Sequence, residues 1–144
     1  MGGSNASPGP PGTGSVSPEQ LLEYARQAAT LAHAPYSRFR VGAAVLAGGS
    51  VFLGCNVENA SYGLCMCAER VAAFKAVSEG HRRLSQVAVS CIDADAALGA
   101  EGRMPCGACR QVLAELADAD TPVHVDGAGT FSLAELLPRA FRLK

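Results

Sequence analysis

Residues 66–92 read MCAERVAAFKAVSEGHRRLSQVAVSCI, and this stretch decides the fold class. Apolar residues recur at helical spacing over residues 66–79, and Gly80 provides a stop. Residues 84–92 alternate and then become continuously apolar, which is typical of a buried strand. The stretch therefore predicts a helix followed by a strand, which is the kind of unit from which layered α/β domains are built.

The residues before this stretch predict a helix and a β-hairpin. Ser17 can cap a helix, and Gln20 stands at the capping-box position three residues later. We expect this helix to continue until Pro35 stops it. Two strand-like segments, residues 39–46 and 51–57, flank the turn sequence AGGS, so the pair predicts a hairpin.

The residues after the stretch predict a second helix, a short strand and a short last helix. Residues 107–117 place apolar residues on one helical face, residues 122–125 form a strand, and residues 132–135 (SLAE) form another capping box. The sequence DGAG at residues 126–129 turns the chain. In total we predict one three-layer α/β/α domain over residues 17–144, around a mixed sheet of about five strands.

Composition indicates a small globular protein. The chain has 144 residues, 49% of them hydrophobic, and a net charge of −1, which fits one packed domain and a small substrate better than a nucleic-acid partner. Because no apolar run is long enough for a membrane span and no secretory signal is visible, we expect a cytoplasmic protein without a membrane partner. Residues 1–16 are rich in Gly, Pro and Ser, and we expect a disordered tail there.

Six cysteines in a chain expected to be cytoplasmic favour metal binding or catalysis over disulfide bonds. Cys67, Cys106 and Cys109 lie in the motifs CAER and PCGAC, each at the start of a predicted helix. Unpaired N–H groups and the helix dipole at such a start stabilise thiolates, the form that binds zinc. Three protein ligands leave the fourth zinc position open for a water. Glu69 can reach that water and act as general acid and base.

Other interpretations of these cysteines are open at this point. A lone Cys-x-x-Cys can be a redox pair, and a purely structural zinc site would need a fourth ligand such as Cys65. Against these, Glu69 and Pro105 complete the Cys-x-Glu and Pro-Cys-x-x-Cys signature of zinc deaminases. We expect Cys55, Cys65 and Cys91 to be small buried hydrophobic residues. Ordinary roles are also expected for the three histidines, His33, His81 and His124.

Over residues 21–141 the chain resembles the small homotetrameric cytidine deaminases of nucleotide salvage. Besides the two cysteine motifs, the matching stretches are APYSRFRVGAA (34–44), GCNVENASYG (54–63), FKAVSEG (74–80) and ELLP (135–138). The resemblance implies one zinc per chain and a homotetramer with pockets shared between subunits. It also implies hydrolytic deamination of cytidine and 2′-deoxycytidine to uridine and 2′-deoxyuridine, with Glu69 as the proton shuttle.

The resemblance further assigns residues to the substrate. It implies that Asn56 and Glu58 bind the ribose, with Glu58 at the 3′-hydroxyl, and that Phe39 packs against the pyrimidine. It implies that the backbone of Ala68 contacts the base and that Arg70 hydrogen-bonds the ligand sulfurs. Three further residues are implied to complete the pocket of a neighbouring subunit: Ala60, Tyr62 and Phe141. The alternatives are core packing for the two phenylalanines and solvated surface positions for Glu58 and Arg70.

Two features depart from the family pattern. The N-terminal tail is longer than the family needs, and the segment between Val123 and Leu133 is short, so we expect truncated last strands. Three competing functions are a deaminase of another aminopyrimidine such as blasticidin S, a polynucleotide editor, and a zinc-stabilised interaction module without catalysis. The Asn56–Glu58 pair argues against the first, and the net charge of −1 offers no basic channel for the second.

Overall fold

The computed structural model describes residues 16–143 of the chain, so all of the tail expected over residues 1–16 except Val16 lies outside the described residues. The helices are α1 (Pro18–Ala29), α2 (Ala68–Ser78), α3 (Gly107–Leu116) and α4 (Leu133–Leu136), with 3₁₀ turns at Tyr62–Leu64 and Glu101–Arg103. The strands are β1 (Val41–Ala47), β2 (Ser50–Cys55), β3 (Gln86–Cys91), β4 (Pro122–Val125) and β5 (Gly129–Ser132). In the part described, no helix is long and apolar enough to cross a membrane.

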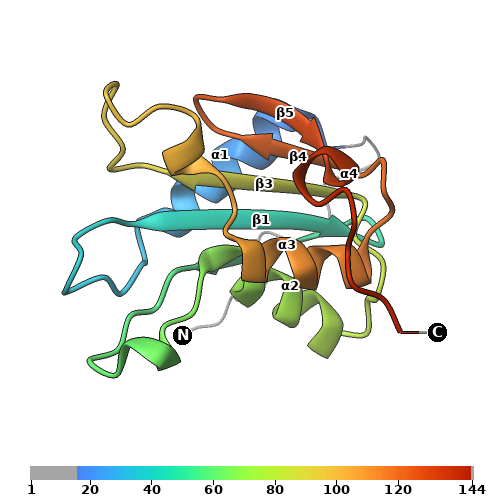
Figure 1. Cartoon of the computed structure of the whole chain (residues 1–144), viewed down its shortest axis with the longest axis horizontal. Helices are drawn as coiled ribbons and strands as arrows, with labels where there is room; N and C mark the ends of the chain where they lie inside the picture. The colour runs from blue at the N-terminus through green and yellow to red at the C-terminus, as the bar shows by residue number, and fades with distance from the viewer. Residues whose placement is uncertain (1–15, 144) are drawn as a thin grey trace.

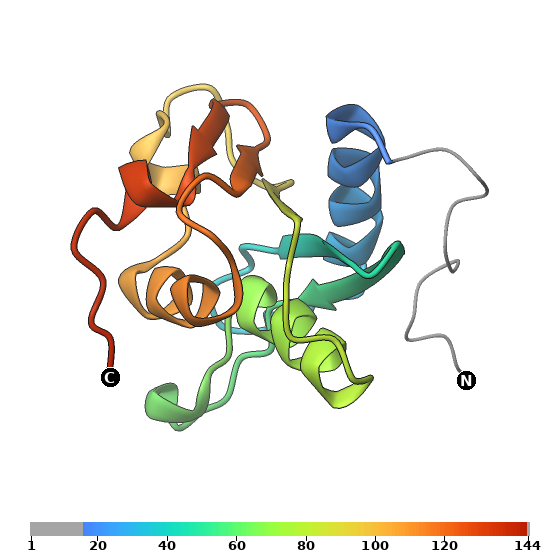
Figure 2. The ribbon, with the colours of Figure 1, turned by 90° about the vertical axis from the view of Figure 1, so that its right-hand side faces the viewer.

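The strands form one mixed sheet in the order β2-β1-β3-β4-β5, with β3 and β4 parallel and the other neighbours antiparallel. Helix α1 lies on one face of this sheet, and α2 and α3 lie on the other (Figures 1 and 2). Side chains alternate between the faces, as a strand requires: Ala43 and Val45 of β1 join the core with α2 and α3, whereas Ala44 joins the core with α1. The predicted three-layer α/β/α class is confirmed.

Two glycines bring helices into backbone contact with the sheet. A Cβ at Gly42 of β1 would lie 1.9 Å from the carbonyl oxygen of Ala25 in α1. A Cβ at Gly54 of β2 would lie 2.4 Å from the carbonyl oxygen of Ala68 in α2. Both helices present alanines to the sheet, so they approach it closely, and in α2 this approach fixes the helix that starts at Cys67.

Several boundaries differ from the prediction. Helix α1 is capped by Ser17 as expected but ends at Ala29, and Leu31 beyond it is 77% exposed. Strand β2 ends at Cys55 and not at residue 57. Val16, expected in the tail, is buried against α1, and its carbonyl accepts a hydrogen bond from the Gln86 side chain.

The last strands are complete, although each has only four residues. Strand β5 pairs with β4 along its whole length, from Gly129 opposite Val125 to Ser132 opposite Pro122. Gly127 and Gly129 both have positive φ, 82° and 127°, and supply the left-handed conformations that this tight hairpin needs. The expected truncation is therefore wrong: the short connection makes a hairpin and the sheet keeps five strands.

Candidate active site

Three cysteine sulfurs meet where α2 and α3 begin. Cys67 is the N-cap of α2, Cys106 is the N-cap of α3, and Cys109 lies in the first turn of α3. The Sγ atoms are 3.7 Å apart between Cys67 and Cys106 and 3.6 Å apart between Cys106 and Cys109, and all three lie within 4.8 Å of one another. Two sulfurs on a tetrahedral zinc with bonds of about 2.3 Å stand about 3.8 Å apart. The sulfurs therefore fit a zinc ion.

The environment of Cys67 favours its thiolate form. Neither Cys67 nor Cys106 uses its side chain to cap its own helix, so both sulfurs are free to bind a metal. A hydrogen bond from Cys109, and a further one that Arg70 Nη2 donates over 3.3 Å, hold the pKa of Cys67 well below its usual range. Cys109 is buried, Cys67 half-buried and Cys106 exposed, so the cluster opens to the surface at Cys106.

Glu69 is a carboxyl group held in an apolar setting beside the cysteines. It stands in the first turn of α2 and is only 4% exposed. Burial raises the pKa of its carboxyl to about 7. A carboxyl with such a pKa can both hold and release a proton near neutral pH, which is the property that general acid–base chemistry requires.

Cys67, Cys106 and Glu69 line a cavity of about 270 Å³, and Cys109 is buried behind this wall beside Cys106. The structure brings to its wall seven of the residues that the sequence singled out: Phe39, Asn56, Glu58, Cys67, Ala68, Glu69 and Cys106. A larger hollow of about 520 Å³ lies around Arg38, Arg40 and Asp93, but it contains no cysteine and its carboxylate is already paired with Arg40. The smaller cavity is therefore the candidate active site.

Asn56 and Glu58 lie just beyond β2 and are both held in place from the Tyr36–Val41 segment. The Asn56 side chain accepts a hydrogen bond from Val41 N and donates one to the carbonyl of Phe39, each 2.9 Å long. Its amide nitrogen therefore keeps one N–H for a ligand. Glu58 accepts from Tyr36 N at 3.0 Å, from Ser37 N at 3.1 Å and from the Ser37 hydroxyl, and these donors lower the pKa of its carboxyl.

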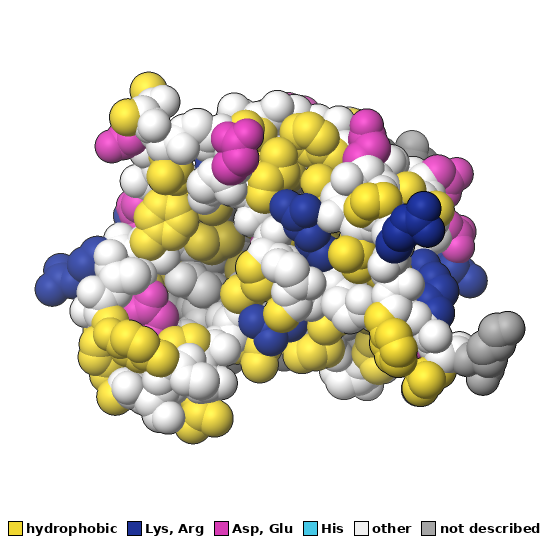
Figure 3. All heavy atoms as spheres, in the orientation of Figure 1, with side chains coloured by type: hydrophobic (Ala, Val, Ile, Leu, Met, Phe, Trp, Pro, Cys, Tyr) yellow, Lys and Arg dark blue, Asp and Glu magenta, His cyan; other side chains and the backbone are white. Residues whose placement is uncertain are grey.

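Ala60, Tyr62 and Phe141 lie outside the cavity. Tyr62 is 74% exposed and meets Tyr36 edge to face, with ring centroids 6.4 Å apart. Large apolar side chains cover the turn after β2, at the lower left of Figure 3, where Tyr62 and Leu64 are exposed. Phe141 is 69% exposed on the C-terminal segment, whose backbone at this residue pairs with the side-chain amide of Gln111.

Other residues of the wall were not identified from the sequence: Val41, Cys65, Met66, Val89, Cys91 and the segment Gly102–Met104. Met66 and Met104 stand next to the cysteine motifs, and this proximity could have indicated them. Cys65 and Cys91 were expected to be buried hydrophobic residues, which is wrong: both are half-buried and face the cavity. Cys55 is half-buried at another site.

A layered α/β domain with three zinc-spaced sulfurs and a buried carboxyl at the starts of two helices defines the class of zinc-dependent deaminases. Sequence comparison identifies the family directly. The profile described as "Cytidine and deoxycytidylate deaminase zinc-binding region" matches residues 15–125. The chain belongs to this family.

Relatives and solved structures agree with this assignment. The cytidine deaminase of Halalkalibacterium halodurans is 50% identical over 128 residues, which cover 85% of this chain and 92% of the relative. The cytidine deaminase of Sporosarcina psychrophila is 43% identical over 129 residues, covering 85% and 90%. The crystal structure of cytidine deaminase from Burkholderia pseudomallei superposes with a TM-score of 0.75 at 45% identity, covering 85% of this chain and 98% of that one.

Proposed function

We propose that the protein hydrolyses the 4-amino group of cytidine and 2′-deoxycytidine, releasing uridine or 2′-deoxyuridine and ammonia. One observation carries this proposal: the wall of a single cavity holds two sulfurs of the three-cysteine cluster, the buried carboxyl of Glu69 and the polar pair Asn56 and Glu58. The names of the relatives support the substrate class. Pyrimidine salvage in the cytoplasm is the role that this activity would serve.

Cys67, Cys106 and Cys109 are proposed to hold one zinc ion per chain. Zinc at this position supplies Lewis acidity that makes a water nucleophilic near neutral pH. Three thiolates outweigh the charge of Zn²⁺, and the hydrogen bond from Arg70 to the Cys67 sulfur withdraws part of the excess. Cys106→Ala and Cys109→Ala should lose most of the zinc measured by elemental analysis, whereas Cys55→Ala should keep it. Full zinc in both ligand variants would rule out this ligand set.

Glu69 is proposed to carry the protons. Its buried carboxylate takes one proton from the attacking water and passes it to ring N3. It then takes the proton of the hydroxyl group left on C4 and passes it to the departing amino group, which leaves as ammonia while the C4 carbonyl forms. Within the described residues, Glu69 is the one acidic residue whose side chain is buried. The carboxylate of Glu58, which also lines the cavity, is engaged by Ser37 and Tyr36.

The remaining residues of the wall are proposed to orient the nucleoside. Phe39 packs against the pyrimidine, and the backbone of Ala68 at the start of α2 contacts the base. The spare N–H of Asn56 and the one remaining acceptor site of Glu58 bind the ribose hydroxyls. Because Glu58 is ionised and held by backbone N–H groups, it is oriented before substrate arrives.

We further propose a homotetramer in which Ala60, Tyr62 and Phe141 complete the pocket of a neighbouring subunit. The support is the exposure of the two aromatic rings together with the hydrogen bonds that anchor Phe141 to Gln111. Apolar rings exposed in this way are suited to burial between chains. Light scattering at assay concentration should report a tetramer, and a fully active monomer would exclude shared pockets.

The test of the proposed function is a panel assay for ammonia release by zinc-loaded protein. Cytidine and 2′-deoxycytidine should be turned over well, whereas adenosine, blasticidin S and single-stranded DNA should be poor substrates. Blasticidin S is the alternative substrate considered from the sequence, and the ribose contacts proposed for Asn56 and Glu58 disfavour it. Preferential turnover of blasticidin S, or no turnover of cytidine, would overturn the proposal.

A further inference from the structure

A three-contact ion pair joins two distant parts of the chain beside the candidate active site. The guanidinium of Arg40 forms a fork with the carboxylate of Asp93, with Nε–Oδ2 at 2.9 Å and Nη2–Oδ1 at 2.8 Å. The backbone N–H of Arg40 donates to the same carboxylate over 2.8 Å. Side-chain hydrogen bonds of this kind hold the pKa of Asp93 at about 2, so the carboxylate is ionised across the neutral range.

Each partner belongs to a segment that lines the cavity. Arg40 stands between Phe39 and Val41, and both of these residues are part of the wall. Asp93 begins the connection from β3 to α3, and the end of that connection, Gly102–Met104, is also part of the wall. The ion pair therefore joins the residue just before β1 to the connection between β3 and α3, which forms another part of the cavity wall.

Hydrogen bonds from side chains hold the backbone of both segments in place. Arg38, just before Phe39, has φ of 59°, a left-handed conformation that a residue with a Cβ adopts only under outside constraint. Asn56 ties the backbone at Phe39 and Val41 from one side, and Asp93 ties Arg40 from the other. In the loop, Arg103 Nη2 donates to the carbonyl of Asp95 over 2.7 Å and brings its two ends together.

We propose that Arg40 and Asp93 are positioning residues for the pyrimidine, which they influence by fixing the place of Phe39 relative to the Gly102–Met104 wall. This inference rests on the proposed function. Neither side chain lines the cavity, so neither touches the base or the reacting atoms. Without the ion pair, these wall segments would be mobile in the free enzyme and would have to become ordered when substrate binds. Because this ordering costs binding free energy, we expect the pair to affect substrate affinity more than the rate of the chemical step.

The test compares Arg40→Ala with Arg83→Ala. Arg83 forms an exposed ion pair with Asp118 that lies outside the cavity wall, so it is a matched control for losing a surface Arg–Asp pair. We expect Arg40→Ala to raise KM for cytidine about 5- to 20-fold, with kcat within about 2-fold and zinc content unchanged. Arg40→Lys should recover part of the loss, since an ammonium can meet Asp93 but lacks the fork.

Two results would overturn the inference: an unchanged KM in Arg40→Ala, or an equal rise in Arg83→Ala. Hydrogen exchange of the free enzyme supplies a readout that does not need activity. Amides of residues 38–41 and 94–104 should exchange faster in Arg40→Ala and not in Arg83→Ala. If the wild-type enzyme fails to deaminate cytidine, the proposed function is wrong. If hydrogen exchange of these amides in Arg40→Ala equals that of wild type, the ion pair does not constrain these segments.

Discussion

Glu58 shows how a single residue can be prepared for one task. Donors from Tyr36 and Ser37 hold its carboxylate ionised and leave it acceptor capacity for one ligand hydroxyl. If that hydroxyl is the ribose 3′-OH, then 3′-deoxycytidine should lose about 1.5–3 kcal/mol, or about 10- to 100-fold in kcat/KM, relative to 2′-deoxycytidine. Steady-state assays of both nucleosides measure this ratio. Equal kcat/KM values would remove Glu58 from the 3′-hydroxyl.

The residues that the sequence could group at the site are those whose pattern is local. Cys106 and Cys109 share one helical turn, and Glu69 stands close to Cys67 along the chain, so short spacing was enough to group them. The wall formed by Gly102–Met104 could not be predicted in the same way. The connection that carries this wall is joined to Arg40 by the long-range ion pair with Asp93, and such a contact leaves no periodic signal in the sequence.

At the level of elements, the contact of α2 with β2 controls the site. A Cβ at Gly54 would lie 2.4 Å from Ala68 O and from Ala72 N, so Gly54→Ala must push α2 away from the sheet. We expect a loss of about 1–3 kcal/mol in the free energy of unfolding, together with weaker zinc retention, because Cys67 is the N-cap of α2. Urea unfolding and zinc analysis measure both effects.

Gly63→Ala is the control for this substitution, because a Cβ at Gly63 meets no heavy atom within 4 Å. It should change the free energy of unfolding by less than about 0.5 kcal/mol. If Gly54→Ala is as stable and as rich in zinc as Gly63→Ala, the close packing of α2 does not position the site.

Element prediction failed mainly at ends and in β5. The apolar spacing of α1 continues to Leu31 in the sequence, but the helix ends at Ala29, where the turn leading to Pro35 begins. Strand β5 has the sequence GTFS, which lacks apolar alternation, and it exists because β4 offers a free edge to a tight hairpin. Pairing with a neighbour, and not local propensity, makes it a strand.

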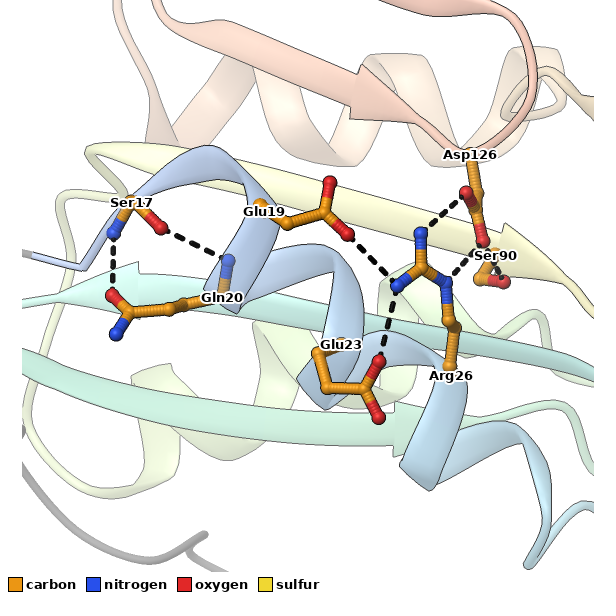
Figure 4. A network of polar contacts seen from close by, with 7 residues as sticks. All are labelled: Ser17, Glu19, Gln20, Glu23, Arg26, Ser90 and Asp126. Atoms are coloured by element: carbon orange, nitrogen blue, oxygen red, sulfur yellow. Dashed lines mark hydrogen bonds and ion pairs between the residues drawn. The ribbon is translucent and has the colours of Figure 1, made fainter.

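At the level of the whole molecule, Arg26 joins α1 to the turn between β4 and β5 through Asp126 (Figure 4). It donates to both oxygens of Asp126, at 2.8 and 2.9 Å, and Asp126 also accepts from Ser90 over 2.8 Å. The hydrogen bonds from Arg26, and then from Ser90, lower the pKa of the Asp126 carboxyl. A lowered pKa in the folded state contributes stability above the ordinary carboxyl pKa and loses it as pH falls through the lowered value.

Asp126→Asn should therefore lower the free energy of unfolding by about 1–2 kcal/mol at pH 7, and the difference from wild type should shrink as pH falls below about 4. Asp118→Asn is the control, because its pair with Arg83 is largely exposed and should contribute less than about 1 kcal/mol. Urea titrations over this pH range decide the matter. A difference that stays constant with pH would mean that the ionised form of Asp126 does not stabilise the fold.

In the proposed active site, a zinc ion held by three cysteines acts together with a proton-carrying Glu69. Glu69→Gln tests this most directly, because it keeps size and polarity, removes the acid and base, and leaves every proposed zinc ligand in place. Zinc content, cytidine affinity and single-turnover rate should be measured on one preparation.

We predict that Glu69→Gln keeps its zinc and binds cytidine with near wild-type affinity, since Phe39, Asn56 and Glu58 are unchanged. The rate of the chemical step should fall about 10⁴-fold or more, at or beyond the upper end of what general acid–base groups contribute. A variant that loses its zinc would make Glu69 part of the metal site. A variant that turns over cytidine at a near-normal rate would contradict the account, because the proton carrier would then lie elsewhere.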